Sequence, residues 1–164
     1  MNAHVKPFKP GDHNEVFPGL ADDPYALRRK LSEPSVCPNC GAVYRDGRWQ
    51  WLARPAQASQ VVCTACHRIA DGMPAGYVYI SGSFARERRA EMLNLIHHHE
   101  ERAKAGHPMK RIMSVSESGD TTIVATTDVH LARDIGSALK SAFQGALDVK
   151  YSRDENLVRV YWQR

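Results

Sequence analysis

Long apolar runs are missing from this sequence. Its 164 residues contain no stretch of about eighteen consecutive apolar residues, the length that a membrane-spanning helix needs. The first ten residues hold Lys6, Lys9 and two prolines, but not the apolar segment that a secretory signal peptide requires. We therefore expect a cytoplasmic protein with no membrane partner.

Motifs that mark common enzymes are also missing. The sequence has no Gly-x-x-x-x-Gly-Lys-Ser/Thr phosphate loop, no Gly-x-Gly-x-x-Gly turn and no Gly-x-Ser-x-Gly nucleophile motif. Three adjacent histidines, His97 to His99, are followed by Glu100, but the His-Glu-x-x-His motif of zinc proteases fails because Ala103 replaces its second histidine. Neighbouring helix residues point about 100° apart, so these histidines favour a solvated helix face. We expect no nucleotide cofactor and no enzymatic activity.

The chain has no strong excess of one charge. It contains 22 Lys and Arg against 18 Asp and Glu, a formal net charge of +4 with a pI near 9.0. The excess lies in the middle, where residues 37–80 hold four basic and two acidic side chains and residues 81–110 hold six and four. This bias is compatible with an anionic partner such as RNA, although many soluble proteins show it too.

Cysteine is scarce, and its spacing is specific. The four cysteines form two Cys-x-x-Cys pairs, Cys37 with Cys40 and Cys63 with Cys66. Each such turn brings two thiolates to one ion at about 2.3 Å, and two turns complete a tetrahedron. Gly41 suits the first turn because glycine readily adopts a positive φ. Redox-active pairs are the alternative, but two pairs with no cysteine left over favour one structural zinc ion with no open coordination position.

The first half of the chain divides into an arm and a metal-binding segment. We expect residues 1–35 to be a flexible arm, because residues 1–23 contain repeated proline and glycine without a sustained apolar period. Within it, Asp23 and Pro24 are a suitable cap and first-turn pair for a short helix that ends before Pro34. Residues 36–82 form the expected zinc ribbon, in which Tyr44 to Val62 would supply the strands. At its end, Tyr77 to Ile80 predict a further strand between two glycines.

The second half alternates between helical and strand patterns. Residues 83–108 have an apolar stripe around Met92 and Ile96 and predict a long helix that connects the two halves. Residues 109–164 predict two strands joined by a hairpin, a helix with apolar residues every four positions, and two strands of alternating polarity. Gly136 costs this helix about 1 kcal/mol relative to alanine, so we expect close packing against a strand there.

These patterns predict one fold. We expect an α+β protein with an N-terminal four-cysteine zinc ribbon, a long helix, and a four-stranded, mainly antiparallel sheet covered by one packed helix (ββαββ).

A mixture of arginine and tryptophan on the expected ribbon indicates a nucleic-acid-binding surface. Guanidinium groups can contact phosphates, and indole rings can stack on bases. The tryptophans could equally pack the core of a small ribbon. The candidate residues are Arg45, Arg48, Trp49, Trp51, Arg54 and Arg68. Lys150, Arg159 and Tyr161 form a weaker candidate on the polar face of the sheet, because Asp148 lies among them.

Several segments resemble a family of small bacterial zinc-ribbon proteins. They are Cys37 to Tyr44, Gly47 to Trp49, Cys63 to Ile69, Pro74 to Gly76 and Thr126 to Gly136. Residues 36–164 are more distantly similar to the zinc-binding N-terminal part of the ribosomal large-subunit export adaptor family of archaea and eukaryotes. That resemblance implies a role with RNA or the ribosome. It implies no nuclear export, because the second cysteine set and the transport signals of that family are missing here.

The patterns leave three hypotheses of different class. The leading one is a non-enzymatic zinc-ribbon protein that binds RNA or associates with the ribosome. The alternative is a protein–protein interaction adaptor with a structural zinc. A small-molecule enzyme is a distant third.

Overall fold

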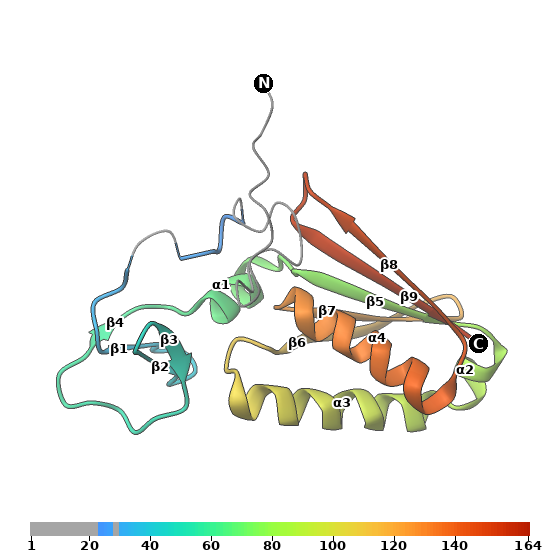
Figure 1. Cartoon of the computed structure of the whole chain (residues 1–164), viewed down its shortest axis with the longest axis horizontal. Helices are drawn as coiled ribbons and strands as arrows, with labels where there is room; N and C mark the ends of the chain where they lie inside the picture. Colours follow the sequence, from blue (N-terminus) through green and yellow to red (C-terminus); the bar gives the residue numbers. More distant parts are fainter. Residues whose placement is uncertain (1–22, 28–29) are drawn as a thin grey trace, which may run out of the picture.

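The computed structural model describes residues 23–27 and 30–164, and within them it contains two β-sheets and four α-helices (Figure 1). The elements are β1 (Ser35–Val36), β2 (Val43–Arg45), β3 (Arg48–Gln50), β4 (Ser59–Gln60), α1 (Thr64–Asp71), β5 (Gly76–Ser81), α2 (Ser83–Glu87), α3 (Arg89–Gly106), β6 (Ile112–Ser118), β7 (Thr121–Thr126), α4 (Val129–Phe143), β8 (Ala146–Ser152) and β9 (Leu157–Gln163). The mixed α+β class is confirmed.

The first sheet is small and belongs to a segment that we call the ribbon unit, residues 35–72. Its strand order is β3-β2-β1-β4, with β1 antiparallel to β2 and parallel to β4. Asp46 and Gly47 connect β2 to β3 with φ values of 55° and 76°, the two positive values that a type I′ hairpin turn requires. Between the cysteine pairs, the predicted strand segment Tyr44 to Val62 contains only the short strands β3 and β4 and part of β2. The second pair lies at the start of a helix, α1, which the sequence patterns did not predict.

The second sheet and its helices form what we call the α+β unit, residues 76–164. The sheet has five strands in the order β6-β7-β5-β9-β8, so the expected count of four is wrong. The additional strand is β5, which lies at the centre, antiparallel to β7 and parallel to β9. The sequence places β5 next to the cysteine pairs, but its hydrogen-bonding partners come from the other end of the chain.

Helices cover one face of this sheet. The helix predicted over residues 83–108 is two helices, α2 and α3, which meet at Arg88 with φ −109° and ψ 21°. Two helices contribute large side chains to the core: Met92 and Ile96 come from α3, and Leu131 and Ile135 from α4. The prediction that a single helix covers the sheet is therefore wrong. Figure 1 shows α3 running beside α4 below the strands.

Gly136 lies where α4 crosses the sheet. A Cβ atom at this position would lie 2.5 Å from Cγ1 of Val160 and 2.9 Å from Cδ1 of Leu147. The expectation of close packing against a strand is confirmed, and two strands, β8 and β9, supply the contacts.

The expected arm is described only in part. Residues 1–22, together with 28 and 29, lie outside the described residues. Asp23 to Leu27 form a turn rather than the start of a helix: the backbone carbonyl of Asp23 accepts from the N–H of Ala26 at 3.0 Å, and its carboxylate accepts from the N–H of Tyr25 at 2.9 Å. The end of the expected arm, Ser35, is already part of β1.

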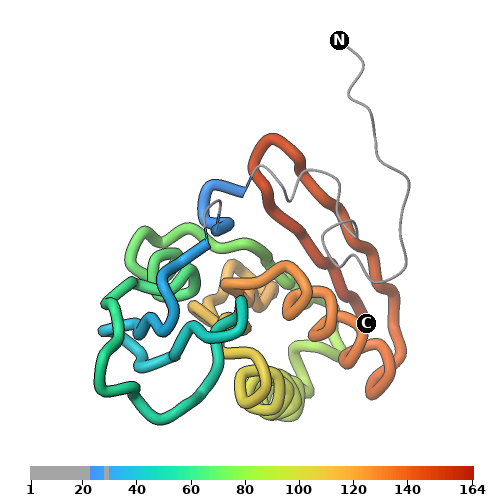
Figure 2. Tube along the Cα trace, turned by 60° about the vertical axis from the view of Figure 1, so that its left-hand side comes forward, coloured from blue at the N-terminus to red at the C-terminus, as the bar shows by residue number. Residues whose placement is uncertain are grey.

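Figures 1 and 2 show the ribbon unit to one side of the five-stranded sheet, beside the C-terminal end of α3. The indole N–H of Trp51 donates to the backbone carbonyl of Lys104 in α3 at 2.7 Å. The two units are therefore in direct contact.

Candidate metal centre and arginine surface

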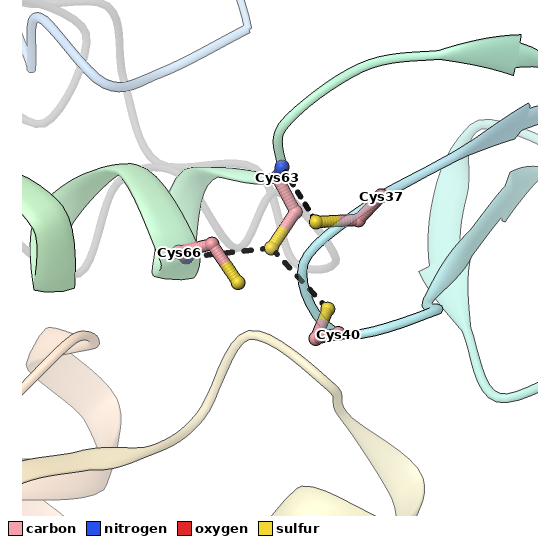
Figure 3. Close-up of side chains that lie close together, drawn as sticks. All are labelled: Cys37, Cys40, Cys63 and Cys66. Carbon is pink, nitrogen blue, oxygen red and sulfur yellow. Dashed lines mark hydrogen bonds between the residues drawn. The ribbon is translucent and has the colours of Figure 1, made fainter.

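The four cysteines converge in the ribbon unit, as the sequence predicts. Cys37 follows β1, Cys40 lies in the next turn, Cys63 precedes α1 and Cys66 lies in its first turn (Figure 3). All four sulfur atoms lie within 4.8 Å of one another, and all four cysteines are free. The sulfurs of Cys40 and Cys63 are 3.8 Å apart, which matches the edge of about 3.8 Å of a tetrahedron with metal–sulfur bonds of about 2.3 Å.

The first pair sits in a tight backbone turn. The N–H of Gly41 donates to the carbonyl of Cys37, and the N–H of Cys37 donates to the carbonyl of Ala42, both at 2.9 Å. Gly41 has φ of 79°, where a side chain would be strained. The expected role of Gly41 in closing this turn is confirmed.

The second pair sits at the beginning of a helix. Cys63 is the N-cap of α1, and its sulfur accepts from the backbone N–H of Cys66 at 3.4 Å. The backbone N–H of Cys63 in turn donates to the sulfur of Cys37 at 3.4 Å. Unpaired N–H groups and the positive end of the helix dipole both favour thiolate sulfur at this place.

Burial and hydrogen bonding act in opposite directions on the thiols. Burial raises the pKa of Cys63 and of Cys66. Burial would also raise the pKa of Cys37, but hydrogen bonds from the backbone N–H groups of Cys63, Cys40 and Asn39 outweigh it and lower that pKa to about 7.

A fifth residue, which the sequence patterns did not predict, completes the cluster. Arg111 is only 7% exposed, and its two terminal nitrogens lie 3.3 Å from the sulfur of Cys66 and 3.1 Å from that of Cys40. Burial lowers the pKa of Arg111, but the hydrogen bonds to Cys40 and Cys66 raise it more, and the net result is above the ordinary value. No local signal could have revealed this contact, because Arg111 is 45 residues from Cys66 along the chain.

The charge of the cluster indicates what it can hold. Four neutral thiols would leave the Arg111 guanidinium buried without an anion, which is unfavourable by several kcal/mol. Four thiolates around a divalent ion carry a net charge of about −2, which a buried arginine partly neutralises. The residues present therefore fit a metal ion, and the four sulfurs leave it no open position for substrate or water.

The predicted nucleic-acid-binding residues do not all lie on the surface. Arg45, Arg48 and Arg54 are exposed, and Trp51 is 39% exposed. Trp49 is 8% exposed and packs edge-to-face on Tyr44 with ring centroids 5.4 Å apart. The core interpretation therefore applies to Trp49, whereas Trp51 lies at the surface.

Arg68 is also internal. It is 5% exposed, forms an ion pair with Asp23 at 2.7 Å, and donates to the backbone carbonyl of Met73 at 3.0 Å. Its guanidinium carbon lies 4.4 Å from the centre of the Tyr25 ring. These contacts bury the guanidinium of Arg68. The prediction that Arg68 belongs to an exposed phosphate-binding surface is therefore wrong.

Two of the remaining arginines, Arg45 and Arg48, lie on either side of the β2–β3 hairpin of the ribbon unit. Arg45 and Arg48 are directly opposite each other in the β2–β3 register. The carboxylate of Glu33 accepts from the backbone N–H groups of Asp46 and Gly47 at 2.9 and 3.1 Å. The tip of the hairpin therefore contains both charges, and the arginines extend from either side of it.

The weaker candidate, on the helix-free face of the five-stranded sheet, is aromatic and charge-balanced. The rings of Tyr79 and Tyr161 stack with centroids 4.9 Å apart and an interplanar angle of 11°. Lys150 pairs with Asp148 at 3.6 Å, and Arg159 pairs with Glu155 at 2.8 Å. The expected neutralisation by Asp148 is present here.

The histidine run lies on α3, where His97 and His98 are exposed and His99 is partly buried. In the described part of the chain, the only group of side chains that could hold a metal ion is the cysteine cluster. A search of the same residues finds no helix with both the length and the apolarity to cross a membrane.

The comparisons with known proteins add no relative: no family model, curated protein or solved structure matches this chain. Fold and site together define a two-part α+β protein with a four-cysteine metal-binding centre. That centre and the surface around it are therefore the features from which a function can be inferred.

Proposed function

We propose that this is a non-enzymatic, cytoplasmic zinc protein that binds RNA or associates with the ribosome. The cysteines hold one structural zinc ion, and the exposed arginines of the ribbon unit contact phosphates.

Zinc is the metal that suits this donor set best. Four thiolates in a tetrahedral arrangement are typical of structural zinc sites, and zinc has no geometric preference that the turn and helix would have to oppose. Because protein sulfur fills every position, the ion stabilises the fold rather than activating water. One zinc per chain in elemental analysis is the expected result; zero or two or more would contradict the assignment.

The observation that carries RNA binding is the pair Arg45 and Arg48. Like charges directly opposite each other across two strands destabilise a sheet. Neither arginine forms an ion pair within residues 23–27 and 30–164. A polyanion that bound here would relieve this repulsion. The ribbon unit has a further exposed positive charge at Arg54 and a partly exposed aromatic ring at Trp51, groups of the kind that contact phosphates and stack on bases.

A sedimentation experiment tests this function. A tagged copy expressed in cells is separated on a sucrose gradient across several growth conditions, with and without ribonuclease. Co-migration with the large ribosomal subunit, lost after ribonuclease treatment, is the expected result. Migration at the top of the gradient in every condition, with no ribonuclease-sensitive absorbance at 260 nm in the purified protein, would contradict it.

The second candidate is a protein-interaction adaptor, and the tyrosine face of the sheet favours it. Exposed aromatic rings are enriched in protein interfaces, and the paired charges beside these rings leave little net positive charge for phosphate. A partner recovered by pull-down that survives ribonuclease, and that is lost when Tyr79 and Tyr161 are replaced by serine, would favour the adaptor.

A further inference from the structure

Arg111 reaches the cysteine cluster from outside the ribbon unit. It belongs to the α+β unit, immediately before β6, and that unit holds it in place. Its Nε donates to the carbonyl of Pro108 at 2.7 Å, and its backbone N–H donates to the hydroxyl of Thr127 at 3.0 Å. The N–H of Thr127 donates back to the carbonyl of Arg111 at 2.9 Å. The guanidinium is therefore positioned by one unit and directed at the metal-binding sulfurs of the other.

The guanidinium contacts sulfur atoms of both cysteine pairs. Nη2 donates to Cys40, in the turn after β1, and Nη1 donates to Cys66, in α1. The same Nη2 lies 3.7 Å from the sulfur of Cys63. A planar fork can make both bonds at once, whereas the single ammonium group of a lysine has no such geometry.

We infer that Arg111 is the countercharge of the metal–thiolate centre, and that metal occupancy, acting through Arg111, holds the ribbon unit against the α+β unit. This inference depends on the metal site proposed above. The bound metal keeps the four sulfurs converged and anionic, so one guanidinium can reach both pairs. When the metal leaves, the two cysteine pairs keep contacts such as the hydrogen bond from the Cys63 N–H to the Cys37 sulfur, but no shared ion fixes a sulfur of each pair at the guanidinium.

The guanidinium carbon of Arg111 also lies 5.8 Å from the centre of the Trp51 ring, and two further side-chain hydrogen bonds between the described residues of the two units join neutral groups. Trp51 donates to the carbonyl of Lys104, and the Thr64 hydroxyl lies 3.2 Å from the sulfur of Met109. Neither contact involves a cysteine sulfur, although Thr64 directly follows Cys63 in the chain. The metal-dependent part of the interface is therefore assigned to Arg111.

Zinc transfer to a chromogenic chelator tests the countercharge. The proteins compared are wild type, Arg111→Met and Arg111→Lys, each shown by NMR to retain the dispersed amide signals of β5 to β9. We expect Arg111→Met to bind zinc about ten- to a hundredfold more weakly and to release it faster, because groups that hydrogen-bond to metal ligands have effects of this size. Arg111→Lys retains the positive charge but not the two-pronged guanidinium, so its zinc affinity should lie between those of wild type and Arg111→Met.

Arg68→Met is the matched control, because Arg68 is another buried arginine of this region but donates to oxygen atoms, of Asp23 and Met73, rather than to sulfur. Its zinc affinity should change less than that of Arg111→Met. Wild-type affinity and release in Arg111→Met, or an equal change in Arg68→Met, would overturn the inference. If Arg111→Met does not fold, Arg111→Lys is compared with wild type instead. Weaker zinc binding and faster release would support the inference, and wild-type values would overturn it.

Hydrogen exchange on the wild-type protein tests the coupling without a substitution. Removal of zinc should increase exchange in residues 107–112 and at Thr127, as well as in the ribbon unit. An increase confined to the ribbon unit would overturn the inference while leaving the zinc site intact. A wild-type protein that binds no metal would instead contradict the proposed function itself.

Discussion

The two units of this protein are stabilised in different ways. The α+β unit has one apolar core of fifteen buried residues, which come from three helices, three of the five strands and Ala75 just before β5. Trp162, Leu131 and Ile135 are among the largest of them. The buried cluster of the ribbon unit has seven residues in the described part of the chain, and three of them are cysteines. An apolar core of the first kind is enough for independent folding, whereas one of the second kind needs a metal.

This contrast explains why the units depend on different parts of the sequence. The α+β unit depends on shape, as at Gly136, where the space for one methyl group is missing. The ribbon unit depends on a few chemical groups at fixed spacing. If the two units are stabilised separately, a change that destabilises one unit should leave the other folded.

The largest effect is expected from Cys63→Ser. The variant should lose zinc and unfold the ribbon unit, because metal binding contributes about 10–16 kcal/mol in zinc-finger peptides and this unit has little apolar core. The amide signals of β5 to β9 should remain dispersed in an NMR spectrum, and metal analysis should give no zinc. A variant that retained both zinc and the ribbon signals would show that the cluster is not structural.

Acidification should release the metal before it unfolds the α+β unit. Burial raises the pKa of Cys63 and Cys66, so zinc must displace protons from these thiols, and its apparent affinity falls as the pH decreases. Zinc release and the circular dichroism of the sheet should be followed together from neutral to acid pH. Coincident transitions would show that the units unfold as one.

Gly136→Ala should affect the α+β unit alone. The added methyl group would lie 2.5 Å from Cγ1 of Val160, and overpacking of this kind is unfavourable by about 1–3 kcal/mol, more than the better helix propensity of alanine recovers. Urea unfolding should show lower stability, with zinc affinity unchanged. Ser137→Ala, at the next and exposed position of α4, is the control and should not be destabilised.

The smallest effect on the fold is expected from replacing Arg45, Arg48 and Arg54 together by alanine. All three are exposed, so zinc content and stability should remain near wild type. If they contact phosphates, the dependence of log affinity for RNA on log salt should become shallower by up to about three units. Binding is measured from low to moderate salt.

The control for this experiment replaces Lys150 and Arg159, whose carboxylate partners already offset their charge, and it should change the slope less. Identical slopes in all three proteins, or no RNA binding at low salt, would favour the adaptor.

Local chemistry was readable from the sequence alone. Two Cys-x-x-Cys pairs predict a common site because each turn has one compact geometry, and Gly41 follows from the same turn. The repeating apolar positions of α4 and the alternation in β8 and β9 predict these elements, because helices and strands have fixed periods. Even the close contact at Gly136 was visible, since a glycine in the middle of a good helix is unfavourable without a packing reason.

Contacts between distant parts of the chain were decided only by tertiary structure. β5 is a strand by its own pattern, but its place between β7 and β9 depends on hydrogen bonds to residues more than forty positions away. Trp49 and Trp51 are two positions apart and of one type, yet only the packing of the ribbon unit buries the first and leaves the second at the surface. From the sequence, Arg111 is an ordinary first residue of a predicted strand, and it contacts the cysteines only because the fold of the α+β unit places it beside them.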